Sequence, residues 1–399
     1  MNVIESGAAA PAGLSGLRIT AVTATAIRPS PDRAESWLSE SLVANPMSIY
    51  PDFRARRSSW QPHWGPPVLV RVQSSDGQQG IGAEAPAAAR PFIEDHFGRL
   101  LVGQDPFAIE RLWDQMFRAS LPWGRKGLAI MALSAVDVAL WDLVGKTLGQ
   151  PLWRLLGGKV RDPIPAYSTG NDVARYKALG FKAFKLAIPH GPADGWEGMK
   201  ANIALVEQAR ELVGPDAEIM LDCYMAWNVE YTLRMARLLE PLRVRWIEEA
   251  LPPDDYEGYS ELTARIDSTA IATGEHEYTR WGFRELIARR CCHILQPDLA
   301  WVGGITEARK VAALASAWGL DVIPHAGGLQ PWTLHFIAST VNAPWAECVV
   351  VGNPGDAQPL RGLYPVLKGV PLAQDGVIAP ADAPGVGVEV DATYLEPVS

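Results

Sequence analysis

The feature that most constrains this sequence is a regular alternation of short β-rich runs with helical segments after Arg161. The runs are mostly apolar and have the length of buried strands, and segments such as Lys200–Val213, Glu230–Leu239 and Ile305–Trp318 have helical periodicity. Eight such runs in series are typical of a (β/α) barrel. The runs are Ile164–Tyr167, Ala183–Leu186, Glu218–Leu221, Val244–Ile247, Ala270–Ala272, His293–Leu295, Asp321–Ile323 and Glu347–Val351.

A doubly wound parallel sheet is the alternative fold, and it would need a glycine-rich turn between its first strand and helix. Gly80-x-Gly82-x-x-Ala85 resembles such a turn, but it lies in a hairpin and runs into Pro86, with no helix opening on it. We therefore favour the barrel.

The chain before the barrel has a mixed pattern. A loosely alternating strand is predicted over Leu17–Ile27, a hairpin over Val68–Gln73 and Gln79–Glu84, and a well-buried helix over Leu128–Leu148. Between the first strand and the hairpin lies the long polar stretch Ser30–Pro67, which is rich in Pro and Trp. Loops of this length are usually functional or disordered, and the aromatic side chains favour a lid that docks. They are Trp37, Tyr50, Phe53, Trp60 and Trp64.

Composition excludes several classes of function. A hydrophobic fraction of 48% and a charged fraction of 20% are those of a globular protein rather than a disordered one. The net charge of −9 argues against nucleic-acid binding, and no uninterrupted apolar run is long enough to span a membrane. Met1–Gly16 lacks the basic start of a signal peptide and is predicted to be a flexible tail. The four cysteines, two of them adjacent at Cys291 and Cys292, indicate reduced thiols and a cytoplasmic protein.

Polar side chains terminate most of the predicted barrel strands. Because catalytic groups of such barrels lie at the carboxyl ends of the strands, we expect these side chains to converge. Successive strand ends are separated by about one βα unit, as the barrel requires. In chain order the residues are Lys185, Asp222, Glu248 with Glu249, Glu275 with His276, Asp298, His325 and, opening the last run, Glu347.

Three of these residues, Asp222, Glu248 and Glu275, lie on consecutive strand ends. Three convergent carboxylates would repel one another strongly without a cation, and an all-oxygen set suits Mg²⁺ better than Zn²⁺. His325 and Asp298 lie on neighbouring strands, where a carboxylate on one imidazole nitrogen raises the basicity of the other. We interpret this pair as a general base.

Two further strand-end residues have several possible roles. His276 directly follows a predicted metal ligand and can support that ligand, contact the substrate or act as an acid. Lys185 can be a base, an electrostatic partner for a carboxylate or a plain surface-facing residue. The sequence pattern does not choose among these roles.

Together these strings resemble the enolase superfamily in its mandelate racemase subgroup, over nearly the whole chain after Gly16. The strings that carry the resemblance are Ile219-Met220-Leu221-Asp222, Trp246-Ile247-Glu248-Glu249, Thr273-Gly274-Glu275, Gln296-Pro297-Asp298, Val322-Ile323-Pro324-His325, the helix Ala132–Asp142 and Leu155-Leu156-Gly157-Gly158. Within the subgroup the chain is most similar to the L-rhamnonate dehydratase branch. That similarity rests on Ala44-Asn45-Pro46-Met47-Ser48-x-Tyr50, Pro189-His190-Gly191-Pro192-x-Asp194-Gly195, Asp222-Cys223, Leu251-Pro252-Pro253-x-x-Tyr256-Glu257 and Gly274-Glu275-His276.

The resemblance implies an α/β fold, a modified (β/α)₇β TIM-type barrel under an N-terminal α+β capping domain. It implies a capping domain of residues 17–155 plus 366–399, with a substrate lid over 30–67, and a catalytic barrel of residues 156–365. It also implies Asp222, Glu248 and Glu275 as Mg²⁺ ligands, His325–Asp298 as the base dyad, Glu347 near the substrate carboxylate and Arg57 as a lid contact.

Two departures from the family pattern bear on the reaction. Mandelate racemases have Lys-x-Lys after the second strand, whereas this chain has Lys185-Leu186-Ala187, which argues against racemisation. The rhamnonate branch also lacks the second Lys. That branch has a His just before the lid Trp that corresponds to Trp37, and this chain has Ser36. Specificity at the far end of the substrate is therefore expected to differ, with L-rhamnonate or a related aldonate such as L-lyxonate as the substrate.

The sequence thus predicts a Mg²⁺-dependent aldonate dehydratase that forms a 2-keto-3-deoxy acid. His325 removes the C2 proton, and His325 or His276 protonates the departing C3 hydroxyl group. The alternatives are an epimerase, racemase or cycloisomerase on the same scaffold, a Schiff-base aldolase using Lys185, and a carbohydrate-binding protein, which the 15 Trp suggest. The expected partner is a small acid sugar, and self-association is expected by analogy only.

Overall fold

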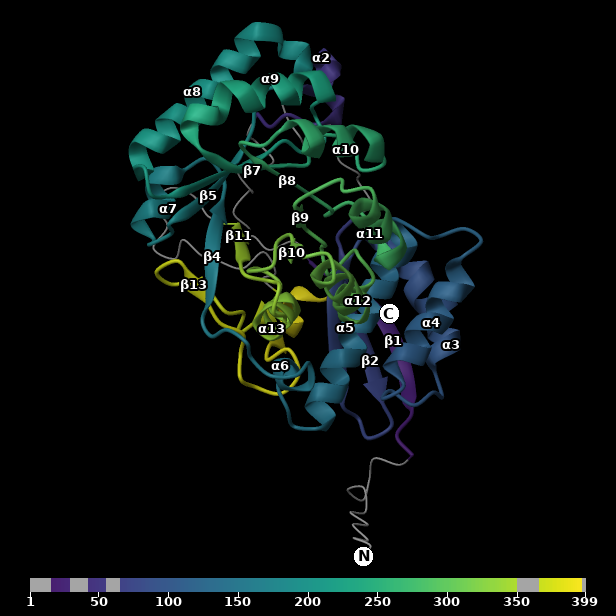
Figure 1. Cartoon of the computed structure of the whole chain (residues 1–399). Coiled ribbons are helices and arrows are strands. Elements are labelled where there is room, and N and C mark those ends of the chain that lie inside the picture. Colours follow the sequence, from purple (N-terminus) through teal and green to yellow (C-terminus); the bar gives the residue numbers. More distant parts are fainter. Residues whose placement is uncertain (1–15, 29–41, 55–64, 350–365, 397–399) are drawn as a thin grey trace, which may run out of the picture.

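The computed structural model describes residues 16–28, 42–54, 65–349 and 366–396 of the chain. Two bodies of structure pack against each other (Figure 1). One is a small antiparallel sheet with helices, built from the N-terminal part of the chain, and the other is a large parallel barrel. The predicted α/β class, with an α+β capping domain beside a barrel, is confirmed.

The capping domain is a three-stranded sheet covered by helices. Its strands β1 (Ile19–Ala26), β2 (Val68–Ser74) and β3 (Gln79–Ala85) pair antiparallel in the order β1-β2-β3. These are the predicted strand and hairpin. The helices that follow are η3 (Ala87–Ala89), η4 (Phe92–Phe97), α3 (Gly98–Leu101), α4 (Ile109–Ser120), α5 (Leu128–Thr147) and α6 (Leu152–Leu155).

Helix α5 is the centre of this domain and lies unusually close to strand β3. A Cβ atom at Gly80 would lie 2.0 Å from the carbonyl oxygen of Ala139, and one at Gly82 would lie 2.1 Å from that of Ala135. The two glycines that resembled a dinucleotide-binding turn therefore have a packing role, because only glycine permits this approach. Helix α5 is also long and apolar enough to cross a membrane by composition, but 83% of its most apolar window is buried inside the protein, as in a core helix.

The barrel follows the (β/α)₇β pattern. Its parallel strands are β4 (Ile164–Thr169), β5 (Ala183–Ala187), β6 (Glu218–Asp222), β7 (Val244–Glu248), β8 (Ala270–Thr273), β9 (Ile294–Leu295), β10 (Asp321–Val322) and β11 (Ala346–Val349). They run in sequence order from β10 back to β4, and β11 pairs with the other edge of β4. The intervening helices are α7 (Val173–Ala178), η5 (Pro192–Asp194), α8 (Gly195–Val213), α9 (Val229–Leu239), η6 (Glu240–Leu242), α10 (Tyr256–Arg265), α11 (Thr279–Ala288), α12 (Gly304–Ser316) and α13 (Pro331–Ser339).

The chain after the barrel contacts both bodies. Strand β13 (Val377–Ile378) pairs antiparallel with barrel strand β4, whereas β12 (Leu367–Lys368) pairs with β14 (Glu389–Val390). Beyond them, after η7 (Ala392–Tyr394), Leu395 forms a bridge with Ile27 of the capping domain. The C-terminal segment, assigned to the capping domain from sequence, thus ties the two domains together.

Part of the predicted lid is described, and it is bound to the barrel. It forms two short helical turns, η1 (Pro46–Ile49) and α2 (Pro51–Arg54). The amide of Ala44 donates to the carbonyl of Ile188 at 2.8 Å, and Arg54 forms an ion pair with Asp194. Both partners lie in the loop after β5, so this half of the segment is attached at the mouth of the barrel.

The packing of α5 on β3 predicts a clear difference between two glycine substitutions. Gly82→Ala places a methyl group against backbone atoms and should lower stability by about 1–3 kcal/mol. Gly98→Ala is the matched control, since its Cβ would be no closer than 3.5 Å to its neighbours and its backbone is helical. It should be neutral or slightly stabilising. Equal thermal unfolding midpoints for the two variants would contradict this account of the packing.

Candidate active site

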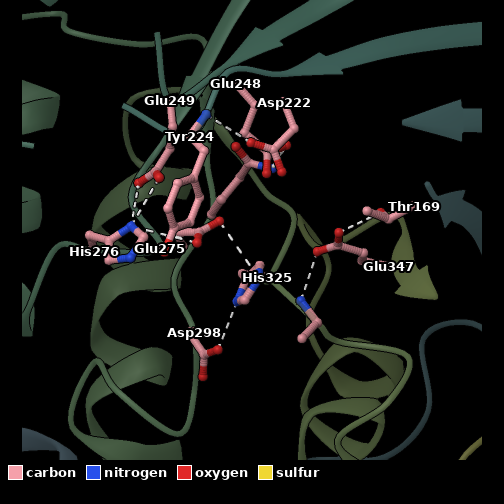
Figure 2. A network of polar contacts seen from close by, with 12 residues as sticks. Thr169, Asp222, Tyr224, Glu248, Glu249, Glu275, His276, Asp298, His325 and Glu347 are labelled. Carbon is pink, nitrogen blue, oxygen red and sulfur yellow. Dashed lines mark hydrogen bonds and ion pairs between the residues drawn. The ribbon is translucent and has the colours of Figure 1, made fainter. Parts of the chain in front are cut away.

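The register of the parallel strands brings the predicted polar residues together at one end of the barrel. In that register Ala187 lies beside Asp222, and Asp222 lies beside Glu248. Glu275 follows β8 after Gly274. Gly274 has a φ of +128°, a backbone conformation that residues with a side chain rarely adopt. The side chains of Asp222, Glu248 and Glu275 therefore point toward the same region, as Figure 2 shows.

Lys185 is the centre of this cluster. Its side chain is fully buried, and its ammonium contacts Glu248, Glu347 at 2.8 Å and Asp222 at 3.3 Å. Burial by itself lowers the pKa of Lys185, but the three carboxylates outweigh this effect and raise it well above its usual value. Of the roles left open for Lys185, the structure favours the electrostatic partner, because an ammonium held in this way is a poor base or nucleophile.

Of the carboxylates around Lys185, Glu347 is the one whose pKa is lowered overall. Thr169 Oγ1 donates to it at 2.5 Å, and the backbone amide of Ala326 donates to its other oxygen at 2.7 Å. Burial raises the pKa of Glu347, but the charges of Lys185 and His325 outweigh this and lower it to about 2. Glu347 is therefore an ionised carboxylate at neutral pH.

Glu248 is fully buried as well, and its environment differs from that of Glu347. Its Oε2 accepts hydrogen bonds from Trp246 Nε1 at 3.0 Å and from Gln296 Nε2 at 2.6 Å. Burial nevertheless raises the pKa of Glu248 to about 8, against the attraction of Lys185. One ammonium cannot neutralise three carboxylates, so Glu248 holds a proton at neutral pH when no other cation is present.

His325 and Asp298 form the predicted pair. The Nδ1 atom of His325 lies 2.8 Å from Asp298 Oδ2, and Gln330 Nε2 donates to Asp298 Oδ1 at 3.0 Å. The other ring nitrogen, Nε2, lies 3.6 Å from Glu275 Oε2. Burial lowers the pKa of His325, but Glu275, Asp298 and Glu347 outweigh it, so the net shift is upward.

His276 is paired with Glu249, a strand-end residue to which the sequence analysis assigned no role. Its Nδ1 lies 2.9 Å from both carboxylate oxygens of Glu249. Burial lowers the pKa of His276, but the charges of Glu249 and Glu275 raise it overall to about 9. Glu249 follows the last residue of β7 and has a φ of 43°, so the regular strand conformation ends at this residue.

Aromatic rings surround the two histidines. The ring centroid of Trp301 lies 5.3 Å from that of His276 and 5.5 Å from that of His325, and the ring of Tyr224 meets His276 edge-on at 5.6 Å. The indole of Trp301 therefore lies beside both imidazoles.

Two groups of side chains could hold a cation here. Ligand atoms of Glu249, Glu275 and His276 already lie within 4.8 Å of one another. In that group, however, Glu249 and His276 satisfy each other as an ion pair, and a protonated imidazole cannot bind a metal. Asp222, Glu248 and Glu275 offer carboxylate oxygens alone, of the kind that Mg²⁺ prefers.

The charges around the second group also fit a divalent cation. Among the described residues, six carboxylates lie close together here, and three groups can carry a positive charge: Lys185, His276 and His325. Burial raises the pKa of Glu275 to about 7, against the attraction of His325, so this carboxyl group is partly protonated near neutral pH. The donor set therefore fits Mg²⁺.

The predicted site residues fall into two sets. The strand-end residues Lys185, Asp222, Glu248, Glu275, His276, Asp298, His325 and Glu347 meet at one end of the barrel. The lid residues Ser36, Trp37 and Arg57 lie outside the described residues. Glu249, Thr169, Gln296, Gln330 and Trp301 were not selected from sequence, although Glu249 and Gln296 were visible in the strand-end strings.

Comparison with known proteins agrees with this architecture. Residues 57–157 match the mandelate racemase / muconate lactonizing enzyme N-terminal domain, and residues 169–394 match the enolase C-terminal domain-like family. The chain belongs to the mandelate racemase and muconate lactonizing enzyme family of the enolase superfamily. Within this family it groups with the L-rhamnonate dehydratases, as its sequence motifs had indicated.

Individual relatives cover nearly the whole of this family member. L-rhamnonate dehydratase of Saccharopolyspora erythraea is 41% identical over 90% of this chain and 92% of the relative. The crystal structure of rhamnonate dehydratase from Gibberella zeae complexed with Mg is 36% identical, with a TM-score of 0.89 over 95% of this chain and 96% of that one. The 3,6-anhydro-D-galactonate cycloisomerase of Zobellia galactanivorans is 28% identical, with a TM-score of 0.77 over 95% and 100% of the two chains.

The raised pKa values of Glu248 and Glu275, about 8 and about 7, predict that Mg²⁺ binding releases protons. Below pH 7 both groups hold protons that a metal must displace, so the affinity should rise from pH 6 to pH 8 and then level off. Calorimetry in buffers of different ionisation enthalpy measures both quantities. An affinity independent of pH in this range would contradict the assignment.

Two variants distinguish the candidate cation groups. Glu248→Gln should weaken Mg²⁺ binding by about 100-fold or more, because it removes a ligand. Glu249→Gln is the matched control and should change the affinity by no more than a few-fold. The reverse order would place the metal with Glu249 and His276.

Proposed function

We propose that this protein is a Mg²⁺-dependent hydro-lyase that converts a sugar acid of the aldonate class to its 2-keto-3-deoxy acid. L-rhamnonate and related aldonates such as L-lyxonate are the substrates to test first. The observation that carries the proposal is the His325–Asp298 pair beside the three carboxylates Asp222, Glu248 and Glu275. The family membership and the dehydratase relatives support it.

The carboxylates of Asp222, Glu248 and Glu275 are the proposed metal ligands. Of these, Asp222 is the most accessible, with 18% of its side chain exposed, whereas Glu248 and Glu275 are buried. When bound, the divalent cation supplies the positive charge that stabilises a substrate carboxylate as it gains a second negative charge. Lys185 and the hydrogen-bond donors Trp246 and Gln296 hold the ligand Glu248 in place.

His325 is the proposed base for the C2 proton. Its Nδ1 is occupied by Asp298, which leaves Nε2 to accept the proton. Glu275 currently attracts that nitrogen, and a cation on Glu275 would remove this attraction and make His325 more readily neutral. A positioned base of this kind contributes about 10²- to 10⁴-fold to the rate.

Loss of water completes the reaction. The C2–H electron pair forms the C2–C3 double bond as the C3–O bond breaks, and the hydroxide leaves as water after it gains a proton. His325 itself can return the proton, or His276 can donate one, since its pKa of about 9 keeps it charged at neutral pH. The enol product then becomes the 2-keto acid.

The environment of Lys185 separates this proposal from a Schiff-base aldolase. An aldolase lysine must be neutral to attack a carbonyl, whereas Lys185 is surrounded by three carboxylates that keep it protonated. An epimerase or cycloisomerase on the same scaffold is the second candidate. It is favoured by the likeness to the cycloisomerase structure, but Ala187 offers no base on the opposite face. A cytoplasmic location and self-association stay predictions.

A substrate screen tests the function directly. The purified protein is incubated with aldonates and aldarates, with Mg²⁺ or with EDTA, and 2-keto acid is measured with semicarbazide. We expect keto acid from L-rhamnonate, L-lyxonate or a close relative in the presence of Mg²⁺ alone. An epimer or an isomer without keto acid would support the second candidate instead.

Histidine variants test the division of roles by exchange of the C2 proton in D₂O. His325→Asn should lower both exchange and dehydration by about 10²- to 10⁴-fold. Mg²⁺ should still bind to this variant. If His276 is the acid that protonates the leaving hydroxyl, His276→Asn should keep exchange but lose dehydration. If His325 is both base and acid, the variant should keep both reactions. Appreciable dehydration by His325→Asn would refute the assigned base.

A further inference from the structure

A half-exposed lysine of the capping domain contacts the barrel loops that follow strands β7 and β8. Lys126 lies in the loop 121–127 between α4 and α5. Its ammonium lies 2.8 Å from Asp254 Oδ1, 3.0 Å from Glu277 Oε1 and 3.4 Å from the hydroxyl oxygen of Tyr256. We call Lys126, Asp254, Tyr256 and Glu277 the interdomain latch.

The carboxylate of Glu277 is the buried partner of the latch. Only 2% of its side chain is exposed, compared with 80% for Asp254. The hydroxyl of Tyr256 donates to Glu277 at 2.5 Å, and the amide of Tyr278 donates to it at 2.7 Å. A Cβ at Gly282 would lie 2.2 Å from Glu277 Oε1, so the carboxylate fits closely over the first turns of α11. A buried carboxylate in this position needs a cation, and Lys126 is the cation that contacts it.

The latch joins two successive loops of the barrel. Asp254 and Tyr256 belong to the loop after β7 and the start of α10, and Glu277 belongs to the loop between β8 and α11. Strand β7 ends at Glu248, and the β8 loop contains Glu275, two residues before Glu277. One capping-domain cation therefore connects the segments that follow two of the three proposed metal ligands.

Other contacts hold the two domains together independently of the latch. Trp113 Nε1 donates to the carbonyl of Gly303 at 2.7 Å, Trp141 Nε1 donates to Thr306 at 2.8 Å, and Lys310 pairs with Glu110 at 2.6 Å. All three contacts involve α12 or the residue that precedes it. Beside the latch the interface instead opens into a cleft of about 810 Å³, lined by residues between Asp114 and Lys126 and by Tyr278–Gly282. Trp281 of α11 stacks on Phe117 of α4 at the wall of this cleft, with 4.5 Å between the ring centroids, so this aromatic contact lies beside the ion pairs of Lys126.

We propose that Lys126 is a positioning residue that fixes the loops after β7 and β8, and hence the ligands Glu248 and Glu275, relative to the capping domain. The link to these ligands rests on the proposed function, whereas the fixing of the loops does not. Lys126 acts through Glu277 and Tyr256 and does not touch the reacting atoms.

The test uses Lys126→Met in the full-length protein. Hydrogen exchange measured by mass spectrometry should speed up by about tenfold in residues 250–258 and 274–286, and remain unchanged in α8. The Mg²⁺ dissociation constant should rise, and kcat should fall by about tenfold with a smaller effect on KM, because a small misplacement of a catalytic group is costly. Lys126→Arg should restore most of each property.

Two matched controls separate positioning from loss of charge or of domain docking. Arg125→Met removes a cation from the same loop, and Arg125 has no ion pair or hydrogen bond within the part of the chain that the structure describes. Lys310→Met removes a different interdomain ion pair. Neither variant should change exchange in the two loops. If Lys126→Met does not fold, Lys126→Met combined with Glu277→Gln removes the unpaired buried charge and is tested in the same way.

The outcomes are separable. Unchanged exchange in both loops, or faster exchange throughout the protein, would overturn the latch whatever the enzyme's activity. Faster exchange confined to the loops without weaker Mg²⁺ binding would overturn the link to the ligands. If the wild-type protein neither binds Mg²⁺ nor forms keto acid, the proposed function fails, and the exchange measurement still decides whether Lys126 fixes the loops.

Discussion

The structure of the site depends on one buried ammonium, that of Lys185. Asp222, Glu248 and Glu347 all contact it, and it is fully enclosed by the barrel. Its single charge is enough to lower the pKa of Glu347 to about 2, but burial still raises that of Glu248 to about 8. The barrel centre therefore keeps an excess of acidic groups that it holds as protonated species in the absence of a metal. An arrangement that stores protons in this way is poised to exchange them for a divalent cation.

Two buried carboxylates on helix α5 of the capping domain hold this helix to its surroundings, the barrel included. On α5, Asp142 accepts the amides of Ile81 at 2.7 Å and Val386 at 2.8 Å, and Asp137 accepts the amide of Thr306 at 3.0 Å. These bonds join α5 to its own sheet, to the C-terminal segment and to α12. The glycines of β3 let the helix approach closely enough for this. The loop before α5 therefore ends at a firmly held helix. This anchoring allows Lys126, near the end of that loop, to position barrel loops as proposed.

Much of this arrangement could be predicted from sequence, because strand periodicity and strand-end polarity are local signals. The eight barrel strands lie where the apolar runs placed them, and the polar residues after them meet. The partner of His276 could not be predicted, because Glu248 and Glu249 are adjacent and identical. Glu249 also has a left-handed backbone conformation, with a φ of 43°, which the sequence pattern did not indicate. The role of Lys185 stayed open for a similar reason: its neighbours come from β6, β7 and β11, which are distant in sequence. The packing role of Gly80 and Gly82 in β3 could not be predicted either, because it depends on their contact with α5.

The position of the two proposed proton-transfer groups limits the chemistry of the site. His276 and His325 both flank the indole of Trp301, so they approach the site from one side. On β5, Lys185 is held by carboxylates and the following inward position is Ala187, which has no group to exchange a proton. A racemase must deliver a proton to the face opposite the one it was taken from, and on β5 the described residues offer no free group for this step. Elimination has no such requirement, because the base that takes the C2 proton can return it to a hydroxyl leaving from the same face. A cycloisomerase has a similar fold, so the fold alone does not decide which reaction is catalysed. The choice between elimination and isomerisation therefore depends on these few residues and on the leaving group of the substrate.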